Sequence, residues 1–202
     1  MQDDDRRPAL YQAFDHAAQV TDRVQPGQLA LPTACPDYDV AALVDHLVGA
    51  AHRTVALGRG ESPTAAEFPH VELSDAPQEI RRAGGEARAA WADDARLRAT
   101  VTMPWGETYT GSTLVDMYLA ELATHAWDLA DATGQELSAD DLAGTALAGA
   151  RAMLRPEYRN TMGKGNPYGS ELTPPAGATP WEGLAAFMGR SPVGAAPGAP
   201  AA

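Results

Sequence analysis

Apolar residues recur at helical spacing through most of the first 155 residues, and this periodicity limits the fold more than any other feature. Leucine, valine and alanine return every three or four positions, as on the buried face of an amphipathic helix, whereas runs of β-branched residues typical of strands are absent. We therefore expect an all-α protein built on an antiparallel four-helix bundle. The spacing predicts helices over residues 7–24, 40–57, 77–97, 112–133 and 140–154, and a short helix over 181–188.

Local signals mark where several of these helices begin and end. Asp39 is a natural N-cap for the helix that follows it. Ser112 or Thr113 can cap the helix that reaches residue 133, and Gly134 stops it. The segment 101–110 is expected to be an extended connector with a turn in its middle.

The sequence favours one domain with a short tail. At 202 residues the chain has the length of a single ordinary domain. We predict that residues 1–190 form the helical bundle and that residues 191–202, which are nearly all alanine, glycine and proline, form a disordered tail. Residues 155–180 are rich in proline and glycine and are expected to be an irregular surface segment.

The charge and the cysteine content argue against several classes of protein. The 27 acidic and 15 basic side chains give a formal charge of −12, which disfavours binding to nucleic acid or to an anionic membrane. No apolar run approaches the ~18 residues of a membrane span, and the acidic start lacks the basic region of a signal peptide, so we predict a cytoplasmic protein. Cys35 is the one cysteine, so a metal site must be built from histidine and carboxylate ligands.

Residues 114–129 combine an apolar helical face with three groups that carry chemistry. At about 100° per residue, Glu121 and His125 lie about 40° apart in or beside the apolar arc, and Asp128 lies about 20° beyond Glu121. Burying an unpaired carboxylate is costly, so such a group is paired, protonated or bound to a metal ion. This face therefore predicts either a metal site or an ordinary i,i+4 hydrogen bond between Glu121 and His125.

A metal site would need a third ligand from another helix. The candidates are His16, His46, His52 and His70. His46 is the best of these because its small neighbours would let another helix approach, although it flanks the apolar stripe rather than lying within it. We expect His52 and His70 to be exposed and His16 to be a surface or packing residue.

Two internal motifs resemble the DinB/YfiT-like metalloproteins, the group that contains the metal-binding domain of mycothiol-dependent maleylpyruvate isomerase. The first motif is Pro32-Thr-Ala-Cys-Pro-Asp-Tyr-Asp-Val-Ala-Ala-Leu-Val-Asp-His-Leu47, and the second is Glu121-Leu-Ala-Thr-His-Ala-Trp-Asp-Leu-Ala130. The segment 184–192 is similar to the ending of actinobacterial single-domain relatives. The resemblance implies a DinB-like four-helix bundle with short additional C-terminal helices. It also implies one divalent metal ion, usually Zn2+, held by His46, Glu121 and His125.

The implied ligands indicate the chemistry. Two histidines and one carboxylate leave a position open at the metal, as in catalytic zinc sites, and also suit Ni2+ or Fe2+. In the family, a low-molecular-weight thiol is used, which is mycothiol in actinobacteria. We therefore predict a metal-dependent transferase or isomerase in which a mycothiol thiolate attacks a small electrophilic substrate. Asp128 is predicted either as a catalytic residue that orients His125 or moves a proton, or as an i,i+3 hydrogen-bonding partner on the rim of the bundle.

Two other functions fit the same residues. A thiol-independent metalloenzyme, such as a hydrolase or cyclase of specialised metabolism, would use the ion as a Lewis acid. A non-catalytic protein would bind a metal ion or ligand, with a homodimer through a bundle face as one arrangement. Cys35 is either a reactive thiol or, more in keeping with its type, a small buried residue.

Overall fold

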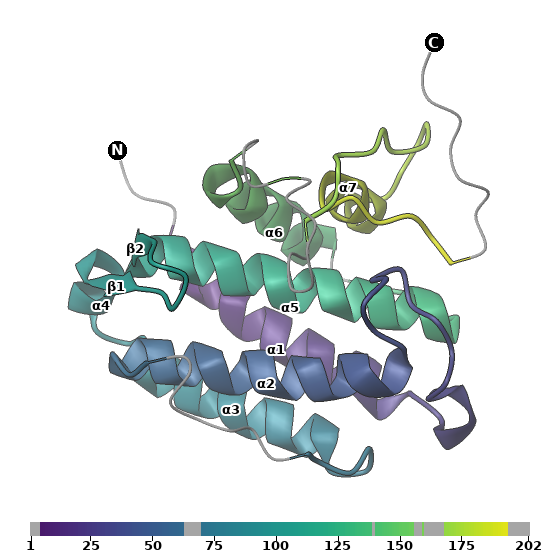
Figure 1. Ribbon diagram of the computed structural model, residues 1–202, viewed down its shortest axis with the longest axis horizontal. Coiled ribbons are helices and arrows are strands. Elements are labelled where there is room, and N and C mark those ends of the chain that lie inside the picture. The colour runs from purple at the N-terminus through teal and green to yellow at the C-terminus, as the bar shows by residue number, and fades with distance from the viewer. Residues whose placement is uncertain (1–4, 63–69, 139, 156–158, 160–167, 194–202) are drawn as a thin grey trace.

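Four long helices form the body of this protein, shown in Figure 1 as a computed structural model that describes residues 5–62, 70–138, 140–155, 159 and 168–193. Helix α1 packs against α3 and α5, and α2 packs against the same two helices, so α1 and α2 lie diagonally across the bundle. The all-α fold predicted from the sequence is confirmed. The four helices are α1 (Arg7–Asp22), α2 (Val40–Arg59), α3 (Ala76–Ala90) and α5 (Gly111–Thr133).

Shorter elements complete the described chain. Helix α6 packs on α5, and α7 packs on α6 and on α5, so these two helices lie on the side of α5 that faces away from α2 and α3 (Figure 1). Most of the predicted tail, residues 194–202, and most of the segment 156–167 lie outside the described residues. The shorter elements are η1 (Pro26–Gln28), α4 (Asp94–Arg98), β1 (Thr100–Thr102), β2 (Thr108–Thr110), α6 (Asp140–Met153) and α7 (Pro180–Phe187).

The expected helix over residues 77–97 is two helices. Helix α3 stops at Ala90, and the next residue, Trp91, turns its indole into the core, where it is 1% exposed and donates a hydrogen bond to the carbonyl oxygen of Thr54 at 2.9 Å. Asp93 then caps α4 by accepting a hydrogen bond from the backbone of Ala95. The packing of one large side chain therefore overrides a continuous helical pattern.

Two of the predicted helix ends are confirmed, and one is wrong. The Asp39 side chain accepts from the backbone nitrogen of Ala42, and Gly134 ends α5 with a positive φ of 70°. However, the N-cap of α5 is Thr110 rather than Ser112 or Thr113. The connector before it is a two-stranded antiparallel hairpin that ends at Thr110. The helix therefore begins directly after the hairpin, at Gly111, which is earlier in the chain than predicted.

Helix α2 is apolar because it is a core helix. Within the described residues it is the helix that is long and apolar enough to cross a bilayer, but 67% of its apolar window is buried inside the bundle. Its buried side chains include Leu43 and Leu47, both 0% exposed, which belong to the same core as Leu114 and Leu122 of α5. The contact between α2 and α5 positions the candidate site.

Candidate metal centre

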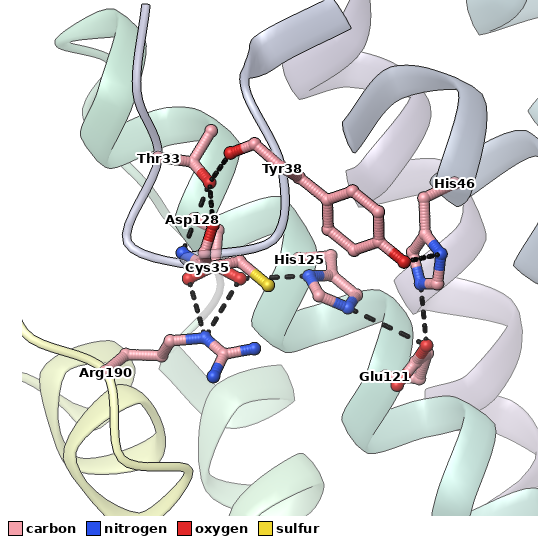
Figure 2. Close-up of polar contacts among 8 residues, drawn as sticks. All are labelled: Thr33, Cys35, Tyr38, His46, Glu121, His125, Asp128 and Arg190. Carbon is pink, nitrogen blue, oxygen red and sulfur yellow. Dashed lines mark hydrogen bonds and ion pairs between the residues drawn. The ribbon is translucent and has the colours of Figure 1, made fainter. Parts of the chain in front are cut away.

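Three side chains from two helices meet where α2 contacts α5. His46 comes from α2, and Glu121 and His125 come from one face of α5, because residues four positions apart share a helical face (Figure 2). The distance from Glu121 Oε1 is 2.8 Å to His46 Nε2 and 3.7 Å to His125 Nε2. One potential donor atom from each residue lies within 4.8 Å of the other two. We call these three residues the open cluster.

Each imidazole of the open cluster is held by its other nitrogen. The Tyr38 hydroxyl lies 3.0 Å from His46 Nδ1, and the two rings pack at a tilt of 31° with centroids 4.7 Å apart. Asp128 Oδ2 lies 2.9 Å from His125 Nδ1. A carboxylate can only accept here, so Nδ1 of His125 donates the hydrogen bond and Nε2 is the nitrogen directed at Glu121.

Charge and burial make this a site that favours a positive charge beside Glu121. The side chain of His125 is 1% exposed, whereas those of His46 and Glu121 are 18% and 14% exposed. Burial opposes ionisation of Glu121, but His125 and His46 hold its pKa well below the usual value. Burial likewise opposes the charged form of His125, but Glu121 and Asp128 raise its pKa to about 9.

A second group of donors lies on the other side of His125. Cys35, His125 and Asp128 also bring their potential ligand atoms within 4.8 Å of one another. Arg190 Nε lies 3.2 Å from both carboxylate oxygens of Asp128 (Figure 2). Cys35 is 2% exposed, Asp128 0% and Arg190 5%. We call these four residues, Cys35, His125, Asp128 and Arg190, the closed cluster, which shares His125 with the open one.

One loop before α2 supplies Cys35 to the closed cluster and also carries Tyr38, which contacts His46 of the open cluster. The loop is closed at its base, where the backbone nitrogen of Val40 donates to the carbonyl oxygen of Leu31 at 3.0 Å. Within it, the Thr33 hydroxyl donates to the carbonyl oxygen of Tyr38 at 2.7 Å and accepts from the backbone nitrogen of Cys35 at 3.2 Å. A single threonine side chain therefore fixes the loop that directs Tyr38 at His46 and Cys35 toward His125.

The other histidines lie elsewhere. His16 is 8% exposed and stacks on Trp181 of α7 at 4.8 Å, which is the packing role that we expected as one option. His70 is exposed and contacts Asp45. The expectation that His52 is exposed is wrong, because α3 covers it: its side chain is 19% exposed and its Nε2 lies 2.8 Å from Glu79 Oε1.

Sequence reasoning missed two contacts of the site. Arg190 is 62 residues from Asp128, so no helical spacing connects them. The only sign in the sequence is one charged residue shortly after an apolar helix near the C-terminal end. Tyr38 lies in a turn, where the direction of a side chain does not follow a simple period. The contacts of both residues with the site follow only from the folded structure.

The donor set of the open cluster fits a divalent transition-metal ion. Two imidazole nitrogens and one carboxylate oxygen are ligands that such ions accept, and four-coordinate sites with three protein ligands keep one position open. Asp128 on Nδ1 of His125 matches the carboxylate–histidine–metal arrangement that orients histidine ligands in proteins, and the Tyr38 hydroxyl takes the corresponding place on His46. The second donor set, with one sulfur, one nitrogen and one oxygen, is also chemically able to hold an ion.

The comparison with known proteins identifies the family of this chain. Residues 10–130 match the family described as the mycothiol maleylpyruvate isomerase N-terminal domain. The chain belongs to this family. The family is metal-binding and is part of the DinB-like superfamily, so the resemblance inferred from the two motifs is confirmed. The match includes His46, Glu121 and His125, whereas Arg190 lies beyond it.

Curated relatives extend the similarity over almost the whole chain. Two uncharacterized proteins, from two strains of Mycobacterium tuberculosis, are each 34% identical to it over 185 residues. The aligned region covers 91% of this chain and 96% of each relative. No solved structure matches the chain significantly.

Proposed function

We propose that this member of the mycothiol maleylpyruvate isomerase N-terminal domain family is a metal-dependent enzyme. It transfers mycothiol, or a similar low-molecular-weight thiol, to a small electrophile, or isomerises a substrate by reversible thiol addition. The observation that carries the proposal is the convergence of two Nε2 atoms and one carboxylate oxygen in the open cluster, with both Nδ1 atoms held by other side chains. Such a set suits Zn2+, and also Ni2+ or Fe2+.

The proposed chemistry needs an activated sulfur. When bound, a divalent ion would keep an incoming thiol deprotonated near neutral pH. In a transfer, the sulfur forms a bond to the electrophilic carbon, the leaving group departs with the electron pair of its bond, and the thiol proton passes to solvent. In an isomerisation, the sulfur adds to a carbon–carbon double bond, the substrate rotates about the resulting single bond, and expulsion of the sulfur restores the double bond.

The residues of the chain have distinct roles in this proposal. His46 and Glu121 are the partly exposed members of the site, so substrate and thiol would approach from their side. Asp128 is fully buried against His125, which supports the orienting role rather than direct proton exchange with a substrate. Cys35 is buried, and burial raises the pKa of its thiol, so the reacting thiol would come from another molecule.

The metal site is tested by the metal content of purified variants. We expect wild type to hold one divalent ion per chain, and His46→Ala, Glu121→Ala and His125→Ala each to lose it. His52→Ala is a matched control because it removes a histidine of the same helix, equally buried and also 2.8 Å from a glutamate. Unchanged metal content in all three site variants would reject the site.

The thiol is tested next. Mycothiol added to the metal-loaded protein should raise its thermal midpoint, and a chelator should abolish this effect. Turnover that depends on metal but does not respond to mycothiol would favour the thiol-independent hydrolase or cyclase. Binding of metal or ligand with no turnover of electrophilic substrates would favour a non-catalytic binding protein.

A further inference from the structure

The segment after α7 inserts a buried guanidinium beside the metal centre, and the proposed function does not use it. Gly189 ends α7 with a positive φ of 78°, and the backbone nitrogen of Arg190 donates to the carbonyl oxygen of Ala185 at 2.8 Å. A Cβ atom on Gly189 would lie 2.6 Å from Gly169 Cα, so the two backbones touch at this point. The position from which the Arg190 side chain starts is therefore closely fixed.

A second contact holds the same segment against α5. The backbone nitrogen of Val193 donates to Asp131 Oδ2 at 2.7 Å, one turn beyond Asp128. Two acidic side chains on one face of α5 thus hold two points of the segment, one by its backbone and one by the Arg190 side chain. Because the segment is attached at two points, the position of the Arg190 side chain beside Asp128 is fixed by the fold.

The two clusters offer alternative ligand sets that compete for His125. The open cluster uses Nε2 of His125, which faces Glu121, whereas the group with Cys35 and Asp128 lies on the Nδ1 side. An ion held by Cys35 and Asp128 would have to displace the hydrogen bond between Asp128 and Nδ1. It would also remove the partner that orients Nε2 toward the open cluster.

Arg190 bears directly on this competition. Its guanidinium contacts both oxygens of Asp128, so a cation placed between Asp128 and Cys35 would meet a positive charge in a buried, weakly screened environment. The same contact holds Asp128 in place to accept from Nδ1 of His125. Both effects favour an ion on Nε2 and disfavour one near the sulfur.

We propose that Arg190 is a positioning residue that decides between the two ligand sets. By holding Asp128 on Nδ1 of His125, it keeps a metal ion on His46, Glu121 and His125 and away from Cys35. This inference rests on the proposed metal site of the open cluster. It adds that ligand choice is controlled from the C-terminal segment, outside the part of the chain that matches the family.

Cobalt reports which set is used, because a cysteine thiolate bound to Co2+ gives an intense near-ultraviolet charge-transfer band that nitrogen and oxygen ligands do not give. Metal-free wild type and Arg190→Met are titrated with Co2+, each with and without Cys35→Ser. We expect no thiolate band in wild type and no effect of Cys35→Ser there. Arg190→Met should gain a thiolate band that the double variant with Cys35→Ser lacks, and its zinc affinity should fall about 10–100-fold.

Two further variants keep the test decisive. Arg190→Lys retains the positive charge and should show no thiolate band. Should Arg190→Met fail to fold, Arg190→Met combined with Asp128→Asn leaves no unpaired charge buried, and its zinc affinity should still fall about tenfold or more. A thiolate band in wild type would overturn the proposal. So would a folded Arg190→Met, or the double variant in its place, that binds both metals as wild type does.

The outcomes also separate this inference from the proposed function. If wild type binds neither Co2+ nor Zn2+, or if Glu121→Ala leaves binding unchanged, the proposed metal site is wrong and the inference fails with it. If wild type binds through His46 and Glu121 but Arg190→Met behaves in the same way, only the role of Arg190 is rejected.

Discussion

The two clusters on either side of His125 are built from similar residues but differ in what surrounds them. The open cluster has two side chains that remain partly exposed, and its one carboxylate faces two imidazoles. The closed cluster is almost completely buried, and its carboxylate, Asp128, is matched by the Arg190 guanidinium and an imidazole. The first has donor side chains that solvent can partly reach. The second has its charge balanced from within the chain.

A set of donor atoms is therefore not by itself a binding site. Each cluster brings three potential ligand atoms within 4.8 Å of one another, yet only the open one has donors that are partly exposed. The closed one is better described as support, because an internally paired carboxylate contributes most by fixing its neighbours.

The largest expected effect is on stability, from Arg190→Ala. Removing one member of a buried ion pair leaves Asp128 uncompensated, so the free energy of unfolding of the metal-free protein should fall by about 3–5 kcal/mol. Urea unfolding measures this change. Arg59→Ala is the control, because Arg59 and Glu86 form a largely exposed pair whose loss should matter by less than about 1 kcal/mol. Equal effects of the two substitutions would contradict the description of the closed cluster as a structural support.

The next effect is on metal affinity, from Glu121→Gln. The amide keeps the size of the side chain but is a much weaker ligand, so affinity for Zn2+ should fall at least about 100-fold, more than is usual for loss of an outer-shell partner. Competition with a chelator of known affinity measures it. Glu79→Gln changes the other glutamate that lies 2.8 Å from a histidine of α2, and it should leave zinc affinity unchanged. A similar loss of zinc affinity in both variants would show that Glu121 is not a ligand of the metal ion.

The third prediction concerns pH and metal removal. Because the pKa of His125 is raised from 6.5 to about 9, protonation of His125 favours the folded, metal-free protein. This contribution is complete below about pH 6.5 and is lost as the pH rises through about 9, by at most about 1.4 kcal/mol per pH unit. The stability difference between wild type and His125→Gln should therefore shrink from pH 6.5 to pH 9 in chelator. With zinc bound on Nε2, wild type should not show this loss, and a flat difference in chelator would refute the prediction.

The smallest expected effect comes from Tyr38→Phe. The substitution removes the hydroxyl on Nδ1 of His46 but keeps the ring that packs against it, so zinc affinity should fall about tenfold with little change in stability. Isothermal titration with Zn2+ measures the affinity. Tyr11→Phe, on α1, is a control that should leave affinity unaltered. An affinity equal to that of wild type would show that the Tyr38 hydroxyl does not orient His46.

The sequence predicted the parts of the site that follow a helical period. Glu121, His125 and Asp128 lie on one face of α5, and their relation could be obtained from angles alone. His46 was favoured among four histidines by its small neighbours, and the structure places it beside Glu121. That these residues bind a metal stays a prediction. The bundle itself was predictable because long apolar stripes leave few other ways to bury them.

What the sequence could not predict depends on contacts between distant or irregular segments. The break between α3 and α4 follows from where the Trp91 side chain finds space, and periodicity does not reveal it. The cap at Thr110 follows from a hairpin whose short strands carry little signal. Arg190 lies beside Asp128 because α6 and α7 pack on α5, so this contact depends on the whole fold.

The loop closed by Thr33 carries Tyr38 for the open cluster and Cys35 for the closed one on a single hydrogen-bonded turn. A change of metal preference by engineering would therefore require that residues 31–39 be exchanged together, because one set of hydrogen bonds positions both Tyr38 and Cys35. A substitution chosen to retune the histidine of α2 would otherwise displace the sulfur beside α5 at the same time.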